Sequence, residues 1–184
     1  HDQGVSVLDD WDGFGQKTTG SGTLTLKNVP VKDSHLIAFE DRFKYQTAYY
    51  QQFHLATLTG IAQSAVESFS HEVRERKRIF SHGNADLARH DAQVLQVIGQ
   101  ASANAYASEA ITQKVAESLQ QAYLSHFTST EVLEHQANVA AELESAQGQV
   151  VVSKLVLDLT SNLFNALSAS ASSRAKQLDR FWRN

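Results

Sequence analysis

Apolar residues recur at helical spacing along most of this chain. Between residues 43 and 78 they form a broad stripe, which predicts a first long helix. The stripe comprises Phe53, Leu55, Leu58, Ile61, Ala62, Ala65 and Phe69. The segment 79–86 breaks the pattern, and a second helix is predicted over 87–124. Thr128 and Glu131 have the spacing of a capping box, which predicts the start of a third helix that reaches Ser168.

No proline follows Pro30, so proline breaks none of these helices. Helices of about 35 residues exceed the usual globular length and need support from neighbours along their whole length. The sequence therefore predicts a mainly α fold, a long antiparallel, up-and-down helical bundle. Residues 36–184 are assigned to this bundle and residues 1–35 to a separate β part.

The β part contains two short runs of strand-forming residues, 4–8 and 22–31. In the second run, Leu24 and Leu26 alternate with polar residues and are predicted to point inward. The glycine-rich stretch between the runs superficially resembles a phosphate-binding loop. That kind of loop needs a helix after it, whereas here a strand is predicted to follow, so an ordered turn is the favoured interpretation.

Composition narrows the classes of partner. Sixteen basic and twenty acidic residues give a net charge of −4, and no block of like charge or 18-residue apolar run occurs. We therefore expect neither a nucleic-acid nor a membrane partner, and a cytoplasmic location. Cysteine is absent, which excludes disulfides and thiolate metal sites. Methionine is absent too and the chain begins with His1, which we interpret as a piece of a longer protein.

A metal site in the bundle is not favoured. Glu131 and His135 lie one helical turn apart and could supply two ligands. Metal sites in helical bundles need a second such pair and further carboxylates, and no matching pair occurs. A solvated helix face explains this pair better, and no metal is predicted.

The basic stretch 72–78 allows two interpretations. Arg74, Arg76 and Arg78 alternate at the end of the first helix, where cations interact favourably with the helix dipole. Taken alone, the stretch is a solvated helix end. Because a spacing of two spreads side chains around a helix, two of these arginines at most could clamp an anion such as a phosphate.

Three motifs in order resemble one family. The helix segment 60–80 is similar to the first long helix of the C-terminal domain of acyl-CoA dehydrogenases, and residues 9–31 resemble the end of the preceding β-domain. The final stretch LDRFWRN, residues 178–184, is most similar to the reduced-flavin-dependent monooxygenases of the dibenzothiophene and dimethyl-sulfone desulfurisation type. The resemblance covers essentially the whole chain. It implies a fragment of a flavoenzyme whose catalytic residues lie outside these 184 residues.

The resemblance also implies a cofactor and its contacts. Phe53 matches a residue that lines the flavin ring, and Arg74 matches a phosphate-contacting arginine of the monooxygenases. Arg76 matches the dehydrogenase arginine that reaches the flavin of a neighbouring subunit. Ser170 falls where one monooxygenase has an arginine on the phosphate, so that contact is in doubt, with Arg174 as a substitute. No catalytic residue is assigned.

The implied activity is the oxygenation of a small sulfur-containing or aromatic substrate with O₂. Reduced FMN would come from a separate flavin reductase, with FAD as the alternative cofactor, and the enzyme would be a homo-oligomer, a tetramer. A dehydrogenase acting on an acyl thioester is the alternative, but the segment Gln46–Gly60 contains no carboxylate that could serve as its base. Tyr45, Tyr49 and Tyr50 near Phe53 suit an apolar pocket, although core packing explains such aromatic residues equally well. A bundle that serves only oligomer assembly is the third possibility.

Overall fold

The computed structural model describes residues 4–79 and 81–184, so predictions that touch residues 1–3 or Phe80 lie outside the described residues. The chain divides into two compact units. One contains the residues up to Phe43 together with Arg183 and Asn184, and the other spans Lys44–Trp182. The predicted domain division between residues 35 and 36 stays a prediction, because compact units of one chain do not define the domains of a longer protein.

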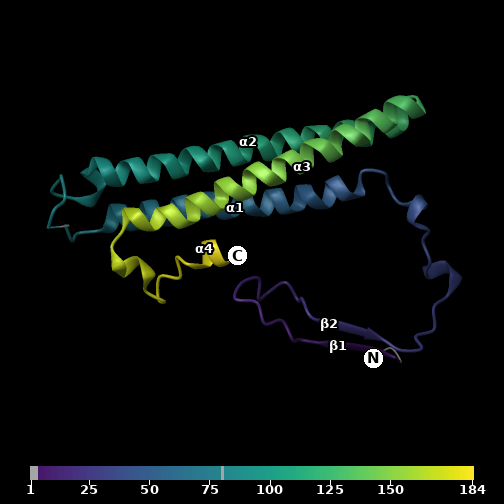
Figure 1. Cartoon of the computed structure of the whole chain (residues 1–184), viewed down its shortest axis with the longest axis horizontal. Coiled ribbons are helices and arrows are strands. Elements are labelled where there is room, and N and C mark those ends of the chain that lie inside the picture. The colour runs from purple at the N-terminus through teal and green to yellow at the C-terminus, as the bar shows by residue number, and fades with distance from the viewer. Residues whose placement is uncertain (1–3, 80) are drawn as a thin grey trace. The chain divides into compact units, whose positions relative to one another are not determined.

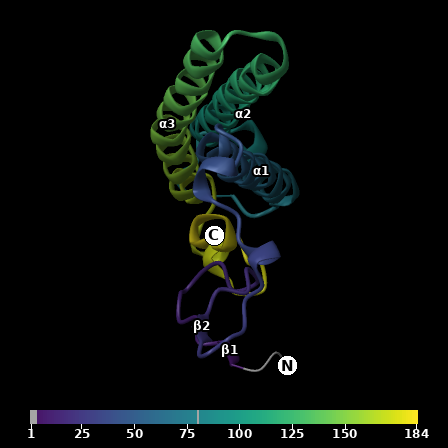
Figure 2. The same ribbon diagram turned by 90° about the vertical axis from the view of Figure 1, so that its right-hand side faces the viewer.

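Three long helices form the second unit. Helices α1 (Gln46–Glu75), α2 (Ala92–Thr128) and α3 (Glu131–Asn162) lie side by side, and each runs antiparallel to the one before it (Figure 1). Each helix packs against the other two, as the end-on view shows (Figure 2). The predicted up-and-down helical bundle is therefore confirmed.

The bundle core follows a spacing of three and four residues on every helix. The buried residues of α2 illustrate it: Val94, Ala101, Ala105, Ser108, Thr112, Val115, Leu119, Ala122 and Ser125. Such spacing is typical of helices that cross at a shallow angle and interlock side chains along their length. At Gly148 of α3 an added Cβ would lie 3.1 Å from Val115 Cγ2 and 3.2 Å from Leu55 Cδ1. Glycine therefore lets α3 approach α1 and α2 closely at one point.

Helix α2 begins later than the sequence predicts, at Ala92 and not at Leu87. Leu87 has an extended backbone, and Ala88–His90 form a separate 3₁₀ turn, η3. Asp91 caps the helix, because its carboxylate accepts hydrogen bonds from the backbone N–H groups of Gln93 (2.9 Å) and Val94 (3.4 Å). The same carboxylate accepts a third bond from the backbone N–H of Asn84, in the preceding loop, at 3.0 Å. These bonds, first of all the one from Asn84, lower the pKa of Asp91.

We expect Asp91→Ala to destabilise the protein in a pH-dependent manner. A depressed carboxyl pKa stabilises the fold above the unfolded-state value of about 3.9, and this stabilisation is lost as the pH falls through the folded-state value. The variant should therefore unfold at lower urea concentration than the wild type at pH 7, and the difference should shrink below about pH 4. Urea titrations between pH 7 and pH 3 measure this. Asp158→Ala is the control, because Asp158 is a half-exposed carboxylate that pairs with Lys154 and caps no helix. An equal effect from both variants would contradict the capping role of Asp91.

Helix α3 also begins at a different cap. Thr128, the predicted cap, is the last residue of α2, and its hydroxyl donates to the Leu124 carbonyl at 3.0 Å. The cap is Thr130, whose side chain accepts from the Leu133 N–H. The helix ends at Asn162, earlier than the predicted Ser168, and two 3₁₀ turns follow, η4 (Leu163–Ala166) and η5 (Ala169–Ser172).

The last element is the short helix α4 (Arg180–Arg183). Leu178 and Phe181 of the terminal stretch are buried, while Trp182 is half exposed. Two of the three apolar side chains in LDRFWRN thus find a place in the core of this chain.

The first unit contains an antiparallel pair of strands, β1 (Val5–Leu8) and β2 (Thr23–Leu26), with Val5 opposite Leu26. The 3₁₀ turns η1 (Asp33–His35) and η2 (Phe39–Asp41) follow them. The prediction that Leu24 and Leu26 point inward is wrong, since both are largely exposed. A two-stranded sheet has no second layer to cover either face. Among the described residues, no helix is long and apolar enough to span a membrane.

Candidate functional site

The structure brings two of the predicted site residues, Arg76 and Ser170, close together. Arg76 follows α1 directly, and its Nη1 donates to the Ser168 hydroxyl at 3.1 Å. The Ser168 and Ser170 hydroxyl oxygens are 3.0 Å apart. Ser168 links the two residues and was not predicted as a site residue. The only sign of it in the sequence is the run of serines at 168–173. One guanidinium and two hydroxyls in a row can donate hydrogen bonds to the oxygens of a phosphate.

Arg74 lies on another part of the same helix end and lines an open cavity of about 330 Å³. The titratable side chains of this cavity are Glu67, His71, Glu72, Arg74, Lys176 and Arg180. Lys176 forms an ion pair with Glu72, and Arg180 Nη1 donates to the Gln177 carbonyl at 2.9 Å. The guanidinium of Arg74 makes no hydrogen bond or ion pair with another residue in the ranges 4–79 and 81–184. Arg74 is therefore free to bind an anion.

Phe53 is 69% exposed and lies on the N-terminal half of α1. Tyr49 and Tyr50 beside it are also about half exposed, with ring centroids 6.0 Å apart. These side chains form an apolar surface, and it carries no carboxylate between Gln46 and Gly60. The surface suits a flat aromatic ring.

Phe53 and Arg74 cannot contact the same small ligand within one chain. They lie on one unbroken helix, 21 residues apart, which corresponds to about 31 Å along the helix axis. This distance exceeds the length of a flavin mononucleotide from ring to phosphate. If both residues contact flavin, they contact two different flavin molecules.

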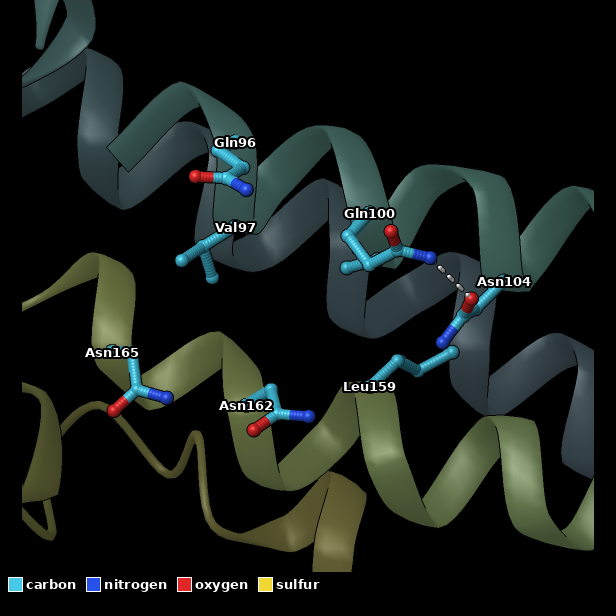
Figure 3. A pocket seen from close by; sticks show the side chains of 8 residues that line it. Gln96, Val97, Gln100, Asn104, Leu159, Asn162 and Asn165 are labelled. Atoms are coloured by element: carbon cyan, nitrogen blue, oxygen red, sulfur yellow. Dashed lines mark hydrogen bonds between the residues drawn. The ribbon is translucent and has the colours of Figure 1, made fainter. Parts of the chain in front are cut away.

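A second cavity, of about 220 Å³, lies between α2 and the end of α3 (Figure 3). Its walls carry the amide side chains of Gln96, Gln100, Asn104, Asn162 and Asn165. Gln100 Nε2 donates to Asn104 Oδ1 at 3.0 Å. Amides can bind a neutral polar group, but they supply neither a proton donor for acid catalysis nor a nucleophile.

Charged groups also meet at the opposite end of the bundle from Arg74. Glu134 accepts hydrogen bonds from Lys44 Nζ (2.8 Å) and His126 Nδ1 (2.9 Å), and these contacts, first the one from Lys44, lower its pKa. Within residues 4–79 and 81–184, no group of three or more His, Asp or Glu side chains could hold a metal ion. His135 has neither a hydrogen bond nor an ion pair with the described residues.

Along the chain, a β unit precedes a long up-and-down helical bundle whose first helix ends in a basic run. Residues 53–184 match the family described as acyl-CoA dehydrogenase, C-terminal domain, and the chain belongs to this family. This confirms the resemblance found in the sequence.

Within this family, the chain is similar to flavin-dependent monooxygenases. It is 26% identical to a probable FMNH2-dependent monooxygenase, SfnC, of Pseudomonas putida, covering 98% of this chain and 46% of the relative. It is 24% identical to dibenzothiophene monooxygenase of Mycolicibacterium goodii, covering 99% of this chain and 45% of the relative. The chain thus spans about half the length of the curated relatives it matches.

The solved structures agree. The FMN-bound structure of TdsC from Paenibacillus sp. A11-2 is 31% identical, with a TM-score of 0.85, and the match covers all of this chain and 47% of TdsC. Methanesulfinate monooxygenase MsuC from Pseudomonas fluorescens has a TM-score of 0.87 at 23% identity, with 99% of this chain and 47% of MsuC covered, which shows the shared fold.

Proposed function

We propose that this chain is the C-terminal part of a flavin-dependent monooxygenase that oxygenates a small sulfur-containing or aromatic substrate. The observation that carries the proposal is the similarity to dibenzothiophene monooxygenase and to FMN-bound TdsC over essentially the whole chain. The absence of a carboxylate from the segment 46–60 supports it, because this is one of the two places where a dehydrogenase of the family can carry its carboxylate base.

Reduced FMN would supply the two electrons and two protons that split O₂ into one oxygen atom for the sulfur or ring carbon of the substrate and one molecule of water. FMN-bound TdsC and the FMNH2-dependent relative favour FMN over the alternative, FAD. Reduced flavin would come from a separate flavin reductase. We place the enzyme in the cytoplasm, since a chain without cysteine gains nothing from an oxidising compartment.

The residues of this chain would hold the cofactor at both ends. Phe53 would pack against the flavin ring and exclude water from its face. Arg74 or Arg76 would bind the phosphate, the latter with Ser168 and Ser170. If both Phe53 and Arg74 contact FMN, their separation of about 31 Å on one helix favours a homo-oligomer in which the two ends of one FMN meet different subunits. The tetramer is proposed from the family resemblance.

The complete protein, supplied with reduced FMN and O₂, is expected to convert dibenzothiophene to its sulfoxide. Liquid chromatography with mass spectrometry measures the product, and label from ¹⁸O₂ should enter it. Turnover of an acyl-CoA thioester with reduction of bound flavin, and no sulfoxide, would instead establish the dehydrogenase alternative. If the complete protein bound no flavin at all, the remaining hypothesis would be a helical bundle that serves only oligomer assembly.

This 184-residue chain by itself is the control for that experiment. We expect no submicromolar binding of oxidised FMN by the chain alone. This chain would supply only part of the contacts to FMN, and these contacts would have to offset the full entropy cost of association. A tight stoichiometric complex would show that the site lies within this chain.

A further inference from the structure

The first two turns of α1 carry the aromatic surface of Tyr49, Tyr50 and Phe53, and the bundle core gives these turns little support. Among residues 46–53, all of which the structure describes, Ala48 alone is buried. From Leu55 onward, α1 buries a residue at every turn: Leu55, Thr59, Ala62, Ala65, Phe69 and Val73. Because the hydrophobic effect scales with the apolar area that is buried, a single alanine contributes little to holding the start of this helix.

The start of α1 also lacks a cap of its own. Tyr45 precedes the first helical residue and makes no capping hydrogen bond with its side chain. The first N–H groups of a helix have no partner within the helix. A carboxylate of α3 takes the place of the cap, because Glu142 Oε1 accepts a hydrogen bond from the backbone N–H of Ala48 at 3.2 Å. The negative charge of Glu142 also lies at the positive end of the α1 dipole.

Two more polar side chains of α3 bind the same part of the chain. Gln149, seven residues after Glu142, donates from Nε2 to the backbone carbonyl of Gln51 at 3.1 Å. Glu134, eight residues before Glu142, accepts from Nζ of Lys44, which lies just before α1. We name Glu134, Glu142 and Gln149 the α3 grip. It spans residues 44–51, the part of α1 and its approach that the apolar core supports least.

The α3 grip acts largely on backbone atoms of α1. The Ala48 N–H and the Gln51 carbonyl belong to the helix itself, so these two bonds fix how far α1 is shifted along its axis and how it is rotated about it. The rotation of α1 in turn sets the direction of its exposed aromatic side chains. Helix α2 adds one bond from the other side, in which Gln52 Nε2 donates to the Thr112 carbonyl at 3.0 Å.

We propose that Glu142 and Gln149 are positioning residues for the flavin ring. By holding the backbone of α1 at residues 48–51, they keep the aromatic surface in the orientation in which it receives the ring. This inference rests on the proposed function, in which Phe53 packs against the flavin. The two side chains act through α1 and not on the reacting atoms.

Glu142→Ala in the complete protein should speed backbone amide exchange of residues 46–53 about 2- to 30-fold, the effect of removing a helix cap. Glu142→Gln should restore slow exchange, because its amide oxygen can still accept from the Ala48 N–H. Hydrogen exchange with mass spectrometry measures this segment. Glu144→Ala is the matched control, since Glu144 lies on the same helix and pairs with Lys114 of α2 and not with α1.

Flavin titration of the same variants tests the positioning role. Glu142→Ala and Gln149→Ala should each lower the affinity for oxidised FMN and for riboflavin by the same factor, at least about threefold, because affinity falls with the fraction of molecules whose binding surface is in place. Loss of a phosphate contact would lower the FMN affinity alone. Circular dichroism at the temperature of the titration checks that each variant is folded, and Glu142→Gln should bind both flavins as the wild type does.

The two measurements separate this inference from the proposed function. Unchanged exchange of residues 46–53 in Glu142→Ala would overturn the α3 grip. Faster exchange with unchanged affinity for both flavins, or a loss of FMN affinity alone, would overturn the positioning role. If the wild type binds no flavin while Glu142→Ala speeds exchange, the proposed function and the positioning role fail together, and the α3 grip stands as a structural contact.

Discussion

Phe69→Ala is expected to lower the free energy of unfolding by about 3–5 kcal/mol, the range for removing a buried aromatic ring. Phe69 is fully buried on α1, and its ring packs edge-on against Phe164, with centroids 5.1 Å apart. The substitution therefore removes apolar contacts with α1's neighbours and leaves a cavity in the core. Urea denaturation monitored by circular dichroism measures the change.

Phe53→Ala is the matched control, because it removes the same ring from the same helix at a position that is 69% exposed. Its effect on the free energy of unfolding should stay within about 0.5 kcal/mol. Similar losses for both variants would mean that Phe53 is covered in the folded protein, and that Phe69 holds no special place in the core.

Replacing the arginines at the end of α1 is expected to weaken FMN binding by the complete protein. A charge-assisted contact to a phosphate contributes about 1.5–3 kcal/mol, so Arg74→Ala or Arg76→Ala should lower the affinity roughly 10- to 100-fold. Arg74 has a guanidinium without a partner among the described residues, whereas Arg76 is already held by Ser168. Each variant is titrated with FMN and with riboflavin, which lacks the phosphate.

Only the affinity for FMN should fall if the lost contact is to the phosphate. Lys77→Ala, an exposed cation at the same helix end, is the control for a general charge effect. Unchanged FMN affinity in both arginine variants would leave the basic helix end as a solvated terminus. Loss of the oligomer in the absence of flavin would assign these arginines to assembly.

The long helices could be predicted from the sequence because their apolar spacing is regular and proline is absent. Their ends could not, because each depends on a local competition between hydrogen-bond acceptors. Thr128 and Thr130 are both capable caps, and the structure uses Thr130 while Thr128 bonds back to Leu124. Similarly, Asp91 captures the N–H groups that start α2, which leaves Leu87 in an extended conformation. The prediction that Leu24 and Leu26 point inward is wrong because an alternating apolar and polar sequence does not by itself provide a second layer to cover the apolar side chains.

The candidate site also depends on contacts that the sequence could not predict, here between residues far apart in the chain. The basic run 74–78 is visible in the sequence, but the different surroundings of Arg74, at the open cavity, and Arg76, beside Ser168, are visible only in the structure. The contact between Arg76 and Ser168 joins residues 92 positions apart, so only the packing of α1 against the end of α3 reveals it. The assignments of Phe53, Arg74, Arg76 and Ser170 to a flavin remain predictions, and the titrations above would test those of Arg74 and Arg76.

The close approach at Gly148 has an evolutionary consequence. A side chain at this position would press on Leu55 of α1 and on Val115 and Ile111 of α2 at the same time. A lineage that replaces Gly148 must therefore shift Val115 and Leu55 by a few tenths of an ångström, and smaller neighbours at these positions would ease that shift. We expect residues 55, 111, 115 and 148 to vary together among related sequences, as a single unit that spans all three helices.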